Sequence, residues 1–129
     1  MNYLEKEIDT ALATLELESI KLGTEELTAL IVALTKKFFT SESTFLNPME
    51  LNDKSSEHNA DFWKELPHRI HKKDLTLLVF DSQYIAWKIE NAQSLGSILG
   101  ETTGYPFWIT DRELTFLVHM DDHDCVIWA

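Results

Sequence analysis

The sequence predicts an α+β domain in which two helices precede a mostly antiparallel sheet of about five strands with one intervening helix. Two observations predict this class. Apolar residues recur at helical spacing through residues 1–40, whereas residues 75–129 hold short apolar runs separated by turn-forming residues. A length of 129 residues and an apolar content of 44% suit one core. We therefore expect residues 1–129 to form a single domain.

The first two predicted helices are joined at Gly23, which suits the end of a helix. Residues 4–15 place apolar side chains on one face of the first helix, and residues 27–38 do so for the second. Thr24 is a suitable N-cap for the second helix. Because the connection is short, we expect these helices to pair as an N-terminal helical hairpin.

The middle of the chain is expected to be mostly irregular. Residues 40–56 are rich in Ser, Thr, Asn and Asp and show little periodicity, so they predict a loop with room for one helical turn near Met49. Ser56 is suited to cap a short helix that continues through Leu66 and ends at Pro67.

The last part of the chain changes to the period of a sheet. A helix capped by Asn91 or Ser94 interrupts it, and Gly96 and Gly100 would let that helix lie close to the sheet. The predicted strands are short apolar runs separated by turns, at residues 75–80, 84–89, 107–110, 114–119 and 125–128.

The charge balance limits the classes of partner. The chain has 22 acidic and 11 basic residues, for a net charge of −11. Such a surface repels phosphate backbones and anionic membranes, which disfavours nucleic-acid and membrane binding. It favours a basic protein partner, although acidity for solubility alone is the simpler explanation. The single cysteine and the charged N-terminus, which lacks a long apolar run, predict a cytoplasmic protein.

The segment from His119 to Cys125 carries the densest set of reactive side chains. One hypothesis is a metal-binding protein or enzyme that uses His119, Asp121, Asp122 and His123. The histidine spacing resembles that of zinc proteases, but Met120 stands where that motif requires glutamate, and the flanking residues have strand character. A solvated hairpin turn is therefore the simpler interpretation, and we expect no catalytic residue, metal or cofactor.

The same turn is a better candidate for binding a protein. Its carboxylates protrude together, and a further acidic segment lies on the same predicted meander. Clustered carboxylates can form charge-assisted hydrogen bonds with Arg or Lys of a partner. The candidate partner-binding residues are Asp111, Glu113, Asp121, Asp122, His123 and Asp124.

Two further features bear on partners. Residues 68–73 form the one basic run and are interpreted as a surface connection, or as one pole of a charge-asymmetric surface that helps self-association. A homo-oligomeric housekeeping protein that assembles through the helical hairpin is therefore another hypothesis.

The order of features resembles a known class of bacterial proteins. Acidic helices come first, followed by the stretch from Tyr105 to Asp124 and a terminal Val-Ile-Trp strand. This layout resembles the immunity proteins of contact-dependent growth inhibition and other polymorphic toxin systems. The resemblance implies an inhibitor that binds a cognate toxin tightly and blocks its active site. These proteins share no diagnostic motif, so no residue role is carried over.

Overall fold

The computed structural model describes residues 3–102 and 104–129 and confirms an α+β fold. Its centre is a seven-stranded antiparallel sheet with the order β1-β4-β3-β5-β6-β7-β2. The helices are α1 (Tyr3–Thr14), α2 (Thr24–Phe38), α3 (Phe62–Arg69) and α4 (Ala92–Glu101), with a single 3-10 turn, η1 (Pro48–Glu50). The strands are β1 (Ser19–Lys21), β2 (Ser55–His58), β3 (Leu75–Phe80), β4 (Tyr84–Ile89), β5 (Phe107–Asp111), β6 (Leu117–Met120) and β7 (Cys125–Trp128).

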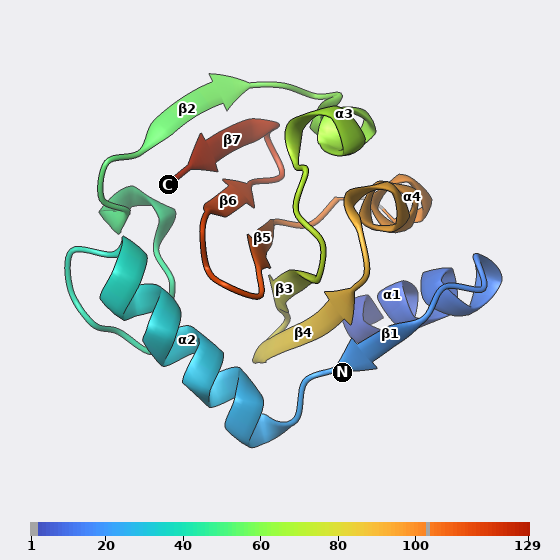
Figure 1. Cartoon of the computed structure of the whole chain (residues 1–129), viewed down its shortest axis with the longest axis horizontal. Helices are drawn as coiled ribbons and strands as arrows, with labels where there is room; N and C mark the ends of the chain where they lie inside the picture. Colours follow the sequence, from blue (N-terminus) through green and yellow to red (C-terminus); the bar gives the residue numbers. More distant parts are fainter. Residues whose placement is uncertain (1–2, 103) are drawn as a thin grey trace.

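The helices are distributed unequally over the two faces of the sheet (Figure 1). Three of them, α1, α3 and α4, cover one face, where they bury the larger apolar core around Trp87 and Ile109. Within the described residues, α2 and the loop after it cover the other face, above Leu78 and Trp108. Alternation along the inner strands β3 to β7 divides their side chains between the two cores, as expected for strands buried on both sides.

The predicted N-terminal helical hairpin is wrong. Strand β1 lies between α1 and α2 and pairs with β4 at the edge of the sheet, and the amide of Leu22 continues this pairing to the carbonyl of Ala86 at 2.9 Å. The chain therefore passes around the edge, and the two helices contribute to different cores. The apolar faces of both helices were correctly identified, but each packs on the sheet.

The sheet has seven strands, whereas the sequence predicted about five. The two additional strands, β1 and β2, lie at the edges of the sheet and have no apolar pattern. All three side chains of β1 are exposed, and those of β2 are exposed or half-buried. Both strands are held by backbone pairing, β1 with β4 and β2 with β7. A periodicity argument detects side-chain burial, so it does not detect strands of this kind.

Several element boundaries also differ from expectation. The N-cap of α2 is Gly23, and Thr24 is its first residue. Ser56 lies in β2 and caps no helix. Helix α3 begins at Phe62 and continues through Pro67. The turn near Met49 and the cap at Asn91, which accepts a hydrogen bond from the amide of Ser94, are confirmed. Among residues 3–102 and 104–129, no helix combines the length and the apolar character that crossing a bilayer would require.

Glycines allow a close approach between α4 and α3. A Cβ at Gly100 would lie 2.7 Å from the Trp63 ring, and one at Gly96 would lie 2.9 Å from the Trp63 carbonyl. The regular helical donor for that carbonyl would be the amide of residue 67, which Pro67 lacks. The glycines were predicted to let this helix approach the sheet, and that prediction is wrong in its partner, because the close approach is made to Trp63 of α3.

We predict that Gly96→Ala destabilises the protein although alanine is the better helix former. The gain in helix propensity is about 1 kcal/mol, whereas forcing a contact against fixed backbone typically costs roughly 1–3 kcal/mol. Chemical denaturation should therefore show a lower free energy of unfolding. Ser97→Ala, at an exposed position of the same helix, is the control and should change stability by less than about 0.5 kcal/mol. Equal behaviour of the two variants would contradict the packing argument.

Candidate functional site

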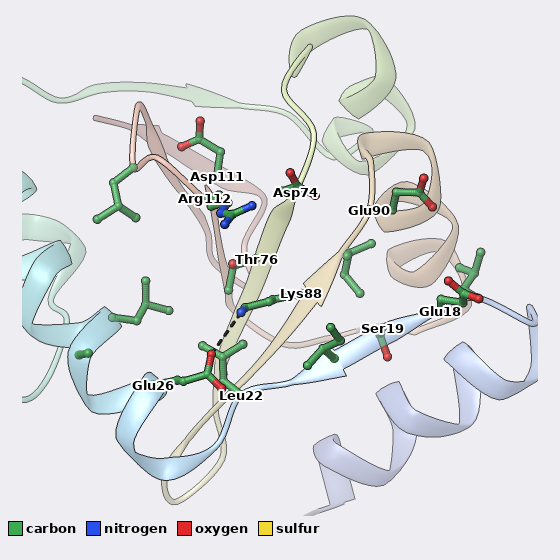
Figure 2. Close-up of a pocket in the computed structure, with 16 residues that line it drawn as sticks. Glu18, Ser19, Leu22, Glu26, Asp74, Thr76, Lys88, Glu90, Asp111 and Arg112 are labelled. Carbon is green, nitrogen blue, oxygen red and sulfur yellow. Dashed lines mark hydrogen bonds and ion pairs between the residues drawn. The ribbon is translucent and has the colours of Figure 1, made fainter.

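The less covered face of the sheet contains a groove of about 1060 Å³ (Figure 2). Its floor is a row of side chains that the strand register aligns: Ile20 of β1 lies opposite Lys88 of β4, which lies opposite Thr76 of β3. Helix α2 forms one wall through Glu26 and Leu30. The opposite side is formed by residues at the ends of the strands. We call this feature the α2 groove.

Negative side chains outnumber positive ones around the α2 groove. Its cations are Lys88 and Arg112. The Lys88 ammonium lies 3.1 Å from a carboxylate oxygen of Glu26, so this ion pair joins the floor to the wall (Figure 2). Both partners are more than half exposed, so the pair contributes little to stability and can exchange partners. The carboxylates that line the groove are Glu18, Glu26, Asp74, Glu90 and Asp111.

Apolar side chains also line the α2 groove. Ile20 is 62% exposed, although it occupies a strand position, because α2 does not extend over it. Leu30 of α2 and Leu114 of the β5–β6 connection are half-buried elsewhere along the groove. A groove with apolar side chains between charged rims suits a segment that is itself amphipathic.

The predicted acidic turn lies elsewhere, between β6 and β7. Asp121 organises it, since one carboxylate oxygen accepts hydrogen bonds from the amides of His123 at 2.8 Å and Cys125 at 3.0 Å. Burial opposes ionisation of Asp121, but these amides outweigh it and lower its pKa. Asp122 and His123 are exposed and 3.6 Å apart, and Asp124 adopts a left-handed conformation. The exposed members are free to meet a partner, whereas Asp121 shapes the turn.

A smaller hollow of about 250 Å³ adjoins this turn. Trp63 of α3 and Tyr105 line it together with carboxylates of the turn. The Tyr105 hydroxyl lies 2.6 Å from that of Thr102, and burial raises the pKa of Tyr105 to about 12. The phenol is therefore neutral near pH 7 and committed to a structural hydrogen bond.

The structure does not bring all six predicted residues together. Asp111 and Glu113 lie at the opposite end of β6 from the turn at residues 121–124, because successive turns of a meander alternate between ends. Glu113 is exposed, but Asp111 is only 3% exposed. Its two carboxylate oxygens accept hydrogen bonds from the amide and the hydroxyl of Thr115, both at 2.6 Å. Asp111 therefore holds the β5–β6 connection.

The histidines of the metal hypothesis are also separated. His119 is 6% exposed and packs against Trp108 with ring centroids 4.3 Å apart, whereas the His123 side chain is 87% exposed in the turn. The Nδ1 atom of His119 is buried and has no hydrogen-bond partner among the described residues. Within residues 3–102 and 104–129, no three His, Cys, Asp or Glu side chains are arranged to hold a metal ion.

The α2 groove was missed at the sequence level because its residues come from segments far apart in the chain. One signal was present. Thr76 and Lys88 are polar residues inside otherwise apolar strands, and such positions often mark a part of a sheet that no helix covers.

Comparison of the chain with protein-family models, with curated proteins and with solved structures found no match.

We predict that Asp111→Ala lowers the free energy of unfolding by roughly 1–3 kcal/mol, because it removes the buried acceptor of two hydrogen bonds. Thermal or chemical denaturation measures this. Glu113→Ala, an exposed neighbour, should change it by less than about 0.5 kcal/mol. If both variants unfold like the parent, the structural role assigned to Asp111 is wrong.

We predict that His119 makes the fold sensitive to acid. Burial lowers the pKa of His119 from 6.5 to about 4, against a smaller opposite effect of Asp121. The unfolded chain therefore binds a proton more readily, and stability falls as the pH decreases from about 6.5 to about 4, by on the order of 3 kcal/mol. Denaturation of His119→Leu across this range should show a shallower loss. His123→Gln is the exposed control and should retain the parent's pH dependence.

Proposed function

We propose that this protein is a protein-binding inhibitor of the immunity type, which neutralises a basic partner by covering its cationic surface. The observation that carries the proposal is the α2 groove, an open amphipathic groove lined by four exposed carboxylates and two exposed cations, with Asp111 as a fifth, buried carboxylate. The chain as a whole has a net charge of −11, and the groove is a concave surface that presents part of this negative charge. The layout shared with toxin-immunity proteins indicates a toxin domain as the partner.

The distribution of ion pairs strengthens the negative field. Lys21 is shared between two carboxylates of α1, at 2.8 Å from Glu5 and 2.7 Å from Asp9. Arg69 pairs with Glu57 and Glu65 in the same way. Cations that are already paired contribute little to the outer surface, so the surplus carboxylates dominate the field that an approaching protein meets.

The strongly perturbed titratable groups support binding over catalysis. The pKa of His119 is lowered and that of Tyr105 is raised, in both cases chiefly by burial. His119 belongs to the α2 side of the sheet, whereas Tyr105 packs against the core on the other side. An acid–base centre requires such groups to converge on one cavity, and these two do not.

Inhibition would proceed by occlusion. A toxin that acts on nucleic acid holds phosphates with Lys and Arg, and an acidic surface competes for the same side chains. Inhibition of this type requires no chemistry from the inhibitor, only a complementary surface and a slow dissociation rate. A protein with this role would act in the cytoplasm, where such a toxin meets its target.

The homo-oligomer hypothesis relied on a helical hairpin, whereas the described helices α1 and α2 contribute to different cores, and this supports the inhibitor over assembly through that hairpin. The inhibitor is therefore proposed to act as a monomer in a 1:1 complex.

We predict a salt-dependent association with a basic toxin domain encoded next to the gene for this protein. The association rate constant, measured by stopped-flow fluorescence, should fall at least tenfold between about 50 and 500 mM salt because electrostatic steering is screened. Calorimetry should give one binding site. A rate that does not respond to salt would refute steering, and a toxin domain that does not bind would refute the proposal.

A further inference from the structure

On the α2 side of the sheet, part of the surface has none of the described helices over it. Along β3, three successive positions on the α2 side are covered differently. Phe80 meets Phe45 of the loop after α2, Leu78 is buried in the core beneath α2, and Thr76 forms the floor of the groove. Six strand residues span about 20 Å, and a helix with its side chains is about 10 Å wide. The part of β3 that neither α2 nor Phe45 covers is the end that carries Thr76, and the exposed side chains of Lys88 and Ile20 continue this opening across the sheet.

The length of the α2 groove can be given in the same terms. It runs from Ile20 of β1 across β4 and β3 to Arg112 after β5, which is four adjacent strands. Three strand spacings of about 4.8 Å make roughly 14 Å, the length of a helix of about ten residues. The groove runs beside α2. The first turns of α2 lie next to β4, because Glu26 pairs with Lys88. The residue that follows α2, Phe39, contacts Trp108 of β5.

The chemistry of the floor selects a helix over a strand. The floor consists of side chains on a sheet whose backbone is already paired between β1, β4, β3 and β5. An extended segment laid there would leave its own backbone groups without partners, whereas a helix satisfies them internally. Ile20 and Leu30 would contact the apolar stripe of such a helix.

The charges at the rims of the groove indicate the charge of the helix that would bind there. Glu26 stands on the α2 wall, and Asp74 and Glu90 stand at the opposite rim, so both flanks of an apolar stripe would meet carboxylates. The groove's two cations are Lys88, which forms an exposed ion pair with Glu26, and Arg112 at the rim near Asp74, so the lining carboxylates remain in excess. A second copy of this chain is a poor occupant, because a protein of net charge −11 repels itself.

We infer that the α2 groove receives a basic amphipathic helix of about ten residues from the protein partner, packed on the sheet beside α2. The inference rests on the proposed function and specifies the contact surface and the shape of the partner. Lys88 occupies the place that a partner cation would take at Glu26, so binding exchanges an internal ion pair for an intermolecular one.

The test uses a ten-residue peptide of leucine and lysine in a helical amphipathic pattern, with a leucine–glutamate peptide of the same pattern as the charge-reversed probe. We expect the lysine peptide alone to shift the backbone amide signals of Ile20, Thr76 and Lys88 in NMR titrations. The double variant Glu26→Gln/Glu90→Gln should weaken binding about three- to tenfold. Glu42→Gln/Glu50→Gln removes the same charge at exposed sites away from the groove and should leave the affinity within twofold.

Lys88→Gln gives a change in the opposite direction. It frees Glu26 and removes a competing charge, so the lysine peptide should bind about two- to fivefold more tightly, which a general folding defect would not produce. Weaker binding by this variant would contradict the exchange of ion pairs. Circular dichroism spectra that match the parent confirm that each variant is folded.

The outcomes separate this inference from the proposed function. If a toxin domain binds but the peptide shifts signals at Asp122 and His123, the inference is overturned and the inhibitor proposal stands. If the peptide fills the groove and no toxin domain binds, the inhibitor proposal fails alone. A parent protein that sediments as a dimer and becomes monomeric when the lysine peptide is added would show that a second copy occupies the groove, which overturns the inference.

Discussion

The pairing of β1 with β4 is the constraint on which the arrangement of the molecule depends. Three exposed residues, together with the bond from Leu22 to Ala86, carry the chain around the edge of the sheet. Without this pairing, α1 and α2 could pack on each other and the second face would lose its helix. Because backbone hydrogen bonds form whatever the side chains are, a segment with no apolar pattern decides where α2 lies.

The unequal coverage of the sheet follows from that path. Three helices bury one face, and the close packing of α4 on α3 at Gly96 and Gly100 leaves little free space there. One helix and a loop cover the other face, where apolar, polar and charged side chains remain accessible between α2 and the strand ends. The two faces therefore differ, since one holds the larger core and the other carries the open α2 groove.

The structure presents two acidic surfaces, the α2 groove and the turn at residues 121–124. Lys21 and Arg69 are each held between two carboxylates of this chain, away from the groove, and this leaves the excess negative charge unbalanced. The predicted acidic turn remains a second exposed acidic site through Asp122. Asp111, which was predicted to bind the same partner as this turn, has a structural role at the other end of β6. The two acidic surfaces are therefore separate in the fold.

The sequence by itself determined the elements that bury apolar side chains and the overall charge. The strands from Leu75 to Trp128, the two N-terminal helices and the cap at Asn91 all follow from local patterns of burial or hydrogen bonding. The edge strands β1 and β2, the separation of α1 from α2 and the α2 groove were decided only by the tertiary structure. The physical reason is that a local pattern records which side chains are buried. It does not record which backbone pairs at an edge, or which face a helix leaves open.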